Sequence, residues 1–333
     1  NLTIDYGVRY SLFQNIGIDT VYNFDENFDT IPGNNFTAYD RGDIYNTYGG
    51  FEPRLGIKYS LTDQSSIKAS YNRMYQYLHL ANNSTSGTPL DVWFPSGTNI
   101  KPRIADQVAL GYFRNFKDNK VEASVEVFYK EVQNAIDFRD NAQLIFNRLL
   151  EGEIRIGEAK AYGAEFFVRK QVGKFQGWVS YTLSRSQRKI AEINRGEWYS
   201  ANYDKPHNIS IVATYDINKY WNLGATFVYT SGLPLTAPTG KFGYQGQQVP
   251  VYSDRNAARI PSYNRADFSV TYNPKKNDDR KLKSSWNLSI YNFYNRKNAF
   301  SVVFTADNVT GETAATKTYL FSIIPTITYN FKF

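Results

Sequence analysis

The segment Phe321-Ser-Ile-Ile-Pro-Thr-Ile-Thr-Tyr-Asn-Phe-Lys-Phe333, at the end of the chain, indicates the fold class. Apart from Ile324, its side chains alternate between apolar and polar. A period of two is the pattern of a β-strand whose two faces meet different surroundings. One face would carry the aromatic and aliphatic side chains, and the other would carry Ser322, Thr326, Thr328, Asn330 and Lys332.

The same alternation recurs upstream, with charged residues on the second face. The segment 120–132 shows one apolar and one charged face, with Val121, Val125, Val127 and Tyr129 opposed to Glu122, Glu126 and Lys130. Charged side chains are costly in the dry core of a β-sandwich, whereas the wet lumen of a barrel accepts them. The charged face therefore favours a barrel.

Twelve segments of this kind follow one another along the chain. Most span about 10–14 residues, longer than the roughly 5–6 of ordinary strands and enough for the roughly 9–11 of a tilted strand that crosses a membrane. The sequence therefore predicts an all-β fold, a transmembrane antiparallel β-barrel. Its expected strands are 2–13, 51–61, 66–78, 103–116, 120–132, 159–171, 174–187, 206–217, 220–231, 262–273, 284–296 and 317–333.

The connections between these segments alternate between short and long. The short ones are 62–65, 117–119, 172–173, 217–219 and 273–283, and the long ones are 14–50, 79–102, 133–158, 188–205, 232–261 and 297–316. Outer-membrane barrels have short periplasmic turns and long extracellular loops. We therefore expect both termini on the periplasmic side. Within one loop, residues 139–156 could form a short amphipathic helix.

Composition agrees with a membrane barrel. The 333 residues include 17% aromatic residues, although the mean hydropathy is only −0.50. Barrels need aromatic residues at both membrane interfaces and a polar lumen. The chain has no cysteine, and the positive charges behind its net +7 are dispersed, so we expect neither disulfides nor nucleic-acid binding. Because no signal peptide is present, we expect a mature chain or a piece of one.

No residue pattern predicts catalysis, so we expect the chain not to be an enzyme. His79 and His207 are the only histidines, and neither lies in a nucleophile motif or a metal-ligand spacing. We expect no catalytic residue, no bound metal and no cofactor. Calcium binding by the acidic loop residues stays open as an alternative to a solvated loop. These residues are Asp25, Glu26, Asp29, Glu151, Glu153 and Glu158.

Aromatic and basic residues near the expected loops are the candidates for contact with a substrate. The aromatic candidates are Trp93, Trp198, Tyr199 and Tyr203, which could stack on a ligand or instead belong to an interfacial girdle. The basic candidates are Arg255, Arg259 and Arg265, which could meet an anionic substrate or simply line the lumen.

Several segments, in this order, resemble the barrel of TonB-dependent outer-membrane receptors. They are Tyr6-Gly-Val-Arg-Tyr10, Pro53-Arg-Leu-Gly-Ile-Lys-Tyr59, Ile100-Lys-Pro-Arg-Ile-Ala-Asp-Gln-Val-Ala-Leu-Gly-Tyr112, Val125-Glu-Val-Phe-Tyr-Lys130, Gly157-Glu-Ala-Lys-Ala-Tyr-Gly-Ala-Glu165, Trp178-Val-Ser-Tyr-Thr-Leu-Ser184, Tyr203-Asp-Lys-Pro-His207 and Tyr229-Thr-Ser-Gly-Leu-Pro234. The closing strand is similar as well, and the resemblance implies that Phe333 is an assembly signal. The sequences of these segments are most similar to those of Bacteroidota receptors with an N-terminal carboxypeptidase-like regulatory domain.

The resemblance implies that residues 1–333 are the C-terminal part of a plugged barrel of about 22 strands. The plug domain and the N-terminal strands would then lie outside this chain. It implies active import of a scarce nutrient, such as a metal chelate, cobalamin, glycan or peptide. The implied partners are outer-membrane lipid, the TonB complex acting through the plug, and a surface lipoprotein or other outer-membrane protein.

Two other functions remain open from the sequence. The chain could be a complete 12-stranded barrel that acts as a passive channel or an outer-membrane enzyme. It could also be a receptor-like barrel that serves as a structural or interaction component of a membrane complex. The sequence does not identify the substrate, because one fold serves many ligands.

Overall fold

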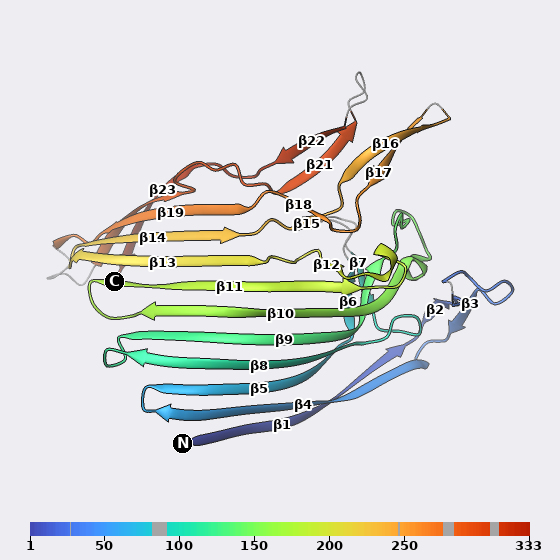
Figure 1. Ribbon diagram of the computed structural model, residues 1–333, viewed down its shortest axis with the longest axis horizontal. Helices are drawn as coiled ribbons and strands as arrows, with labels where there is room; N and C mark the ends of the chain where they lie inside the picture. Colours follow the sequence, from blue (N-terminus) through green and yellow to red (C-terminus); the bar gives the residue numbers. More distant parts are fainter. Residues whose placement is uncertain (27, 82–91, 246, 276–282, 307–312) are drawn as a thin grey trace.

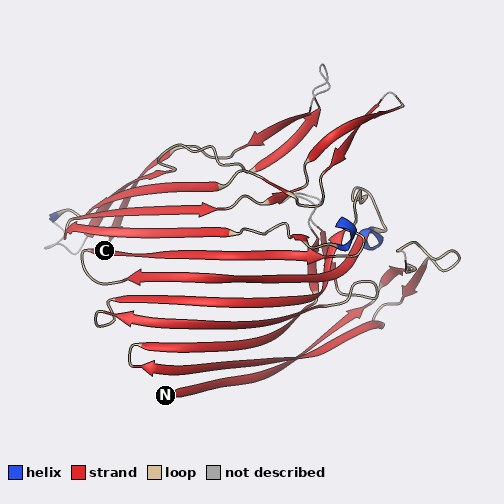
Figure 2. Ribbon diagram, in the orientation of Figure 1, coloured by secondary structure: helices blue, strands red, loops and turns tan. Residues whose placement is uncertain are grey.

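One large antiparallel sheet dominates the computed structural model, which describes residues 1–333 except 27, 82–91, 246, 276–282 and 307–312 (Figures 1 and 2). Twelve strands follow one another across the sheet in chain order. They are β1 (Leu2–Ile16), β4 (Ile44–Thr62), β5 (Ser65–Gln76), β8 (Arg103–Phe116), β9 (Val121–Phe138), β10 (Ile154–Lys170), β11 (Phe175–Lys189), β13 (His207–Asn218), β14 (Trp221–Thr230), β19 (Tyr263–Tyr272), β20 (Lys283–Tyr291) and β23 (Ile324–Lys332).

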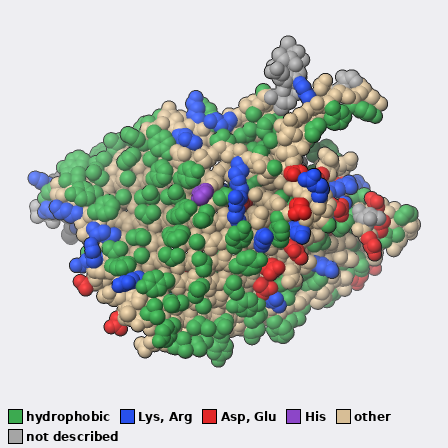
Figure 3. Space-filling model, viewed as in Figure 1, with side chains coloured by type: hydrophobic (Ala, Val, Ile, Leu, Met, Phe, Trp, Pro, Cys, Tyr) green, Lys and Arg blue, Asp and Glu red, His purple; other side chains and the backbone are tan. Residues whose placement is uncertain are grey.

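The predicted all-β fold with twelve successive strands is confirmed, because each observed strand overlaps one predicted segment. The pairing registers also keep like side chains on one face. Val127 of β9, for example, is paired with Leu110 of β8 and with Ala164 of β10. We call this face the apolar face, and the opposite one, which carries Glu126 and Glu165, the charged face. Figure 3 shows apolar side chains spread over the strands.

Short turns join the strands at one end of the sheet, and longer loops join them at the other. Both termini lie at the end with the short turns (Figure 1). The turn between β8 and β9 is tight because Lys117, Asp118 and Asn119 all have positive φ angles of 52–65°. The predicted alternation of short and long connections is therefore observed.

The longer loops contain small hairpins and two short 3-10 helices. The hairpins are β2 (Asp19–Tyr22) with β3 (Phe36–Tyr39), β6 (Leu78–Ala81) with β7 (Val92–Pro95), β16 (Pro238–Tyr244) with β17 (Gln247–Tyr252), and β21 (Ser301–Ala306) with β22 (Thr313–Thr318). The loops also contain a short strand pair, β15 (Pro234–Leu235) with β18 (Ala258–Arg259), and the short strand β12 (Tyr199–Ser200). The two 3-10 helices are η1 (Leu150–Glu153) and η2 (Asn194–Gly196).

Several predicted segments differ from the structure, and β9, β10 and β20, for example, end or begin about five residues away from the predicted bounds. The strand expected at 51–61 begins at Ile44, because the β1–β4 ladder continues as far as the pair Ile16–Ile44. The strand expected at 317–333 is two elements, since Thr313–Thr318 pairs with β21 and β23 begins only at Ile324. The amphipathic helix expected within 139–156 was wrong. Only η1 forms there, and residues from Ile154 onward join β10.

The buried core lies at the loop end of the sheet, where loop elements pack against the ends of β9 and β10. One cluster joins β6, β7, β9 and β10 through Ala81, Phe94, Ile136, Phe138 and Ile154, together with Ile100. Leu144 and Leu150, from the segment in which the helix was expected, pack against this cluster. A second cluster consists of Ile190, Ile193 and Tyr199. Loops packed in this way hold polar side chains in fixed positions. Among the described residues, no helix is long and apolar enough to span a membrane.

Candidate functional site

A bulge in β9 positions the central carboxylate of the loop end. Gln133 and Asn134 of β9 are opposite a single residue of β10, Glu158, and Asn134 has a φ of 56°. An extra residue in one strand changes the face on which the following side chains lie. Beyond the bulge, Asp137 is opposite Arg155, on the charged face that also carries Arg188 of β11.

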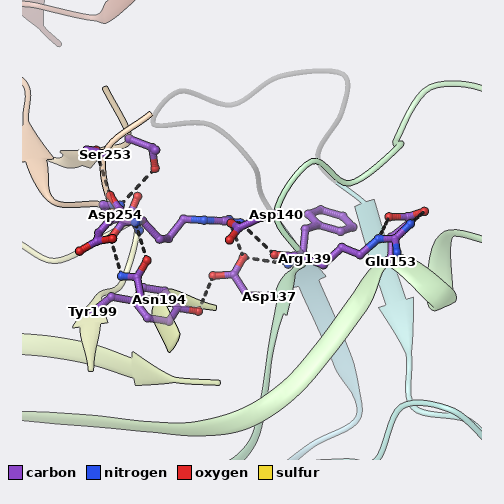
Figure 4. A network of polar contacts seen from close by, with 12 residues as sticks. Asp137, Arg139, Asp140, Glu153, Asn194, Tyr199, Ser253 and Asp254 are labelled. Carbon is purple, nitrogen blue, oxygen red and sulfur yellow. Dashed lines mark hydrogen bonds and ion pairs between the residues drawn. The ribbon is translucent and has the colours of Figure 1, made fainter. Parts of the chain in front are cut away.

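Asp137 is 1% exposed and connects three segments of the chain. Its Oδ2 atom accepts a hydrogen bond from the Tyr199 hydroxyl at 2.9 Å (Figure 4). The same atom lies 3.0 Å from Nη1 of Arg188. Its Oδ1 atom accepts from the backbone N–H of Phe138 at 2.9 Å. Burial, and after it the charge of Asp137, raise the pKa of Tyr199 above its usual value, so its phenol remains protonated and donates.

Arg255 connects the loop before β18 to the same cluster. Its Nη1 atom lies 3.7 Å from Oδ1 of Asp137, and its Nη2 atom donates to Oδ1 of Asp140 at 2.6 Å. The side chain of Asn194 holds the Arg255 backbone. Its Oδ1 accepts from the Arg255 N–H at 2.6 Å, and its Nδ2 donates to the Arg255 carbonyl at 3.2 Å.

A second buried carboxylate, Asp204, anchors β18. It is 1% exposed, and its Oδ1 accepts from the backbone N–H of Ser186 at 2.7 Å. Its Oδ2 accepts from Nη2 of Arg259, whose Nη1 donates to the carbonyl oxygens of Asp204 and Gly232 at 2.9 and 3.0 Å. Two buried carboxylates thus tie separate loops to the strand ends.

A cavity of about 950 Å³ lies beside this network. Its lining comes from the loop after β9, from the region of η2, from β15, from β17 with the loop that follows it, and from β21. The lining includes Arg139, Asp140, Asn141, Glu192, Asn194, Arg195, Asn202, Leu235, Tyr252, Asp254, Arg255, Asn256, Val302 and Phe304. A cavity of this size, with polar groups that converge from several segments, is a candidate ligand site.

The charged residues of this lining are three arginines and three acids, and each has an ion partner. Arg139 forms hydrogen bonds of 2.6 and 2.9 Å with Glu153. Glu192 accepts from Arg155 at 2.5 Å, and the exposed pair of Arg195 and Asp254 lies at 3.3 Å. With Arg255 bound to Asp140, the lining carries no net charge. It presents amide groups and Tyr252, which is 56% exposed.

Four of the predicted site residues belong to this region. Tyr199 and Arg255 bind Asp137, Arg259 binds Asp204, and the ring of Tyr203 lies 5.8 Å from the Arg188 guanidinium. Of these, only Arg255 lines the cavity.

The other four predicted residues lie elsewhere. Trp93 is exposed on β7, and the ring of Trp198 lies 3.9 Å from the ammonium of Lys160, on the apolar face. Arg265 binds Asp267 at 2.9 Å and lies over the Tyr291 ring. Phe333 is 96% exposed at the end of the chain.

Sequence reasoning missed the residues that organise the site, above all Asp137, Arg188 and Asn194. A signal was present for the first. Asp137 stands in the apolar run Ala135-Ile136-Asp137-Phe138, and a lone carboxylate in such a run needs a buried partner. Among the described residues, no group of three His, Asp or Glu side chains is arranged to hold a metal ion.

The two histidines have different surroundings. His79 of β6 is 0% exposed, and its Nε2 lies 2.9 Å from the Ser96 hydroxyl, while its Nδ1 has no partner among the described residues. In the described part of the chain, no carboxylate orients this ring as in a catalytic triad. His207 is exposed, and its Nδ1 lies 2.9 Å from the Tyr181 hydroxyl.

Burial, and after it the charge of Arg103, lower the pKa of His79 from 6.5 to about 4. Because the unfolded chain takes up this proton near pH 6.5 and the folded chain only near pH 4, stability should be lost as the pH falls through that window. We expect a loss on the order of 3 kcal/mol at most. Thermal unfolding between pH 8 and pH 4 measures it.

The matched variants are His79→Gln and His207→Gln. The first removes the buried titrating group and should flatten the pH dependence between 6.5 and 4, whereas the second should leave it unchanged. Equal slopes for His79→Gln and the unmodified protein would show that this histidine is not the titrating group.

Comparison with known proteins agrees with the β-barrel fold. Residues 1–295 match the family described as TonB dependent receptor-like, beta-barrel. This chain therefore belongs to the β-barrel family of TonB-dependent receptors. No curated protein sequence matches it significantly.

Solved structures show the same fold at low identity. The ferric-catecholate import receptor Fiu of E. coli K12, in its closed form, has a TM-score of 0.59 and 16% identity, over 99% of this chain and 42% of that one. The siderophore receptor PiuA of Acinetobacter baumannii has 0.59 and 17%, over 99% and 41%. The ferric preacinetobactin receptor BauA of the same species has 0.58 and 13%, over 98% and 40%. This chain spans about two-fifths of the length of these receptors.

Proposed function

We propose that this chain forms part of the wall and the outer loops of an active transporter that imports a scarce nutrient across the bacterial outer membrane. The observation that carries the proposal is the cavity at the loop end, which five segments line and two buried carboxylates stabilise. The family described as TonB dependent receptor-like supports the same function, and the structurally similar Fiu is described as an import receptor.

The exposed apolar face supports placement in the membrane. Large apolar side chains such as Tyr6, Val8 and Ile327 are 68–86% exposed along the strands. Contiguous exposed apolar surface of this extent marks a surface that is covered in the native environment. In the proposed orientation the short turns and both termini are periplasmic, the longer loops are extracellular, and outer-membrane lipid covers the apolar face.

The sheet also supports a larger barrel. Among the described residues β1 and β23 do not pair with each other, so each leaves a row of backbone groups unpaired. Lipid does not satisfy such groups, and a spanning sheet must therefore close. We propose that this chain is the C-terminal part of a barrel of about 22 strands, of the Bacteroidota type with a regulatory N-terminal domain. The plug and the remaining strands would complete it.

The substrate classes that we propose are a metal chelate, cobalamin, a glycan or a peptide. Each of these compounds is too large for a narrow pore. Each would bind to the amide groups and Tyr252 of the cavity lining before import. The TonB complex would act through the plug, and a surface lipoprotein or other outer-membrane protein could cover the loops. No residue of this chain is given a catalytic role.

Uptake by whole cells that carry the full receptor tests the proposed function. A ferric catecholate, cobalamin, a neutral oligosaccharide and a peptide are offered in turn. Import of one of them should require both this receptor and TonB, and it should stop when a protonophore dissipates the proton gradient. Entry that persists without TonB would instead indicate a passive channel.

Tyr252→Ala should weaken binding of the imported compound to the purified receptor by up to about tenfold, because an aromatic contact contributes roughly 0.5–1.5 kcal/mol. Tyr244 is the matched control. It belongs to the same hairpin and is 60% exposed, but it does not line the cavity. Calorimetric titration compares the two variants. Equal affinities for Tyr252→Ala and Tyr244→Ala would argue against this cavity as the binding site.

A further inference from the structure

Arg103, the first residue of β8, has two buried donors without acceptors. Its Nε and Nη2 atoms are shielded from water and have no hydrogen-bond partner in the part of the chain that the structure describes. Nearly all buried donors in folded proteins are paired, because an unpaired one loses its hydration without replacement. A half-buried guanidinium with two shielded, unpaired donors indicates a partner that lies outside these residues.

The pairing registers place Arg103 on the charged face. Ala105, two residues further along β8, lies in one row with Val132, Ala159 and Arg188 across β9, β10 and β11. Arg103 is one step closer to the loop end on the same face. The guanidinium lies within electrostatic reach of Arg188, Tyr203 and Asp137.

Among the described residues, no carboxylate accepts a hydrogen bond from Nε or Nη2 of Arg103. The oxygens of Asp137 accept from the Phe138 N–H on one side and contact Arg188 and Tyr199 on the other. Arg255 forms an ion pair with Asp140. Arg188 and Arg255 thus contact one carboxylate that is 1% exposed, Arg103 lies within electrostatic reach of it, and the two shielded donors of Arg103 have no acceptor among the described residues. An uncompensated buried cation is strongly unfavourable.

We propose that Arg103 is the anchor of an oxyanion site, which binds a carboxylate or phosphate group. The Nε and Nη2 donors form the side-on fork of the guanidinium, and this fork matches the two oxygens of such a group. Arg188 adds positive charge from the neighbouring position.

His79 supplies a second unpaired polar atom at this place. Its Nδ1 is buried without a partner, and its ring lies within electrostatic reach of Arg103. When the Ser96 hydroxyl donates to Nε2, the ring hydrogen is on Nδ1, which can then donate to the same anion. Two elements, β6 and β8, thus each carry an unpaired buried polar atom within electrostatic reach of the other.

The oxyanion has two sources with the same chemistry. It is either a group of a diffusible ligand, or an Asp or Glu carboxylate of the polypeptide outside the described residues. The two sources predict opposite responses to added anions. Neither response depends on transport, so the site is tested separately from the proposed function.

The experiment measures the thermal unfolding of the full-length receptor, purified in detergent with Tris chloride. Sodium phosphate and sodium acetate are titrated against sodium chloride at equal ionic strength. The test variant is Arg103→Gln, and the matched control is Arg114→Gln, an exposed arginine at the other end of β8. Arg103→Lys restores the charge.

With a diffusible source, phosphate or acetate should raise the Tm of the unmodified protein and of Arg114→Gln by a few degrees, saturably, but not that of Arg103→Gln. With a polypeptide source, the added anions should have no effect. Arg103→Gln should then lower the Tm by a few degrees, because it leaves the buried carboxylate without a cationic partner. Arg103→Lys should recover most of the loss. The proposal is overturned if no added anion raises the Tm and Arg103→Gln is as stable as the unmodified protein. It is also overturned if Arg103→Lys recovers none of the lost Tm.

Discussion

Replacing Asp137 by asparagine should destabilise the loop end by about 3–5 kcal/mol, the usual cost of removing one partner from a buried ion pair. The substitution keeps the shape of the side chain but removes its charge. It leaves Arg188, which is 7% exposed, without its anion, and it weakens the contact of Arg255. It also deprives the buried Tyr199 hydroxyl of a charged acceptor.

Denaturant unfolding of the full receptor, together with limited proteolysis of the loops, measures this effect. Asp254→Asn is the control, because Asp254 belongs to one exposed ion pair with Arg195 and should change stability by less than about 1 kcal/mol. The loops should become sensitive to protease in Asp137→Asn alone. Similar small losses in both variants would mean that Asp137 does not organise the loop end.

The strands were predictable because their pattern is local. A strand between lipid and a polar lumen repeats the same alternation over its whole length, so Val125, Val127 and Tyr129 are sufficient to assign one face of β9. The boundaries near the loops were less predictable. Where the loops pack over both faces, as around Ile136 and Phe138, the alternation no longer reflects two different surroundings.

The site was only partly predictable because its contacts are not local. Tyr199 lies 62 residues from the carboxylate that it binds, and Arg255 lies 117 residues from the Phe138 carbonyl that it contacts. Residue type indicated that Arg255 and Tyr199 were candidates, but it did not indicate their partners. The bulge at Asn134, which gives Asp137 its direction, has no signature in the alternation.

Arg265 shows the limit of the same reasoning within a strand. It was expected to face the lumen as a candidate for substrate contact, and it lies on the charged face. However, Asp267 lies two residues further along the same face and binds it at 2.9 Å. A period-two pattern places both residues on one side of the sheet. Because the two side chains are neighbours of opposite charge, they form an ion pair, and Arg265 is then not available to an anionic ligand.

Gly163→Ala should prevent correct assembly of the β9–β10–β11 part of the wall. The added Cβ would lie 2.4 Å from the Leu183 carbonyl oxygen and 3.0 Å from Cα of Ser184, so backbone and not a flexible side chain would have to move. Such overpacking costs about 1–3 kcal/mol or more, and here it would also stretch the ladder that pairs β10 with β11. Gly7→Ala on β1 is the matched control, because its Cβ would meet no atom within 4 Å. We expect Gly163→Ala to reduce sharply the folded band of the full receptor on unheated gels and Gly7→Ala to leave it intact. If both variants fold equally well, the close approach of β10 to β11 at this glycine does not limit assembly.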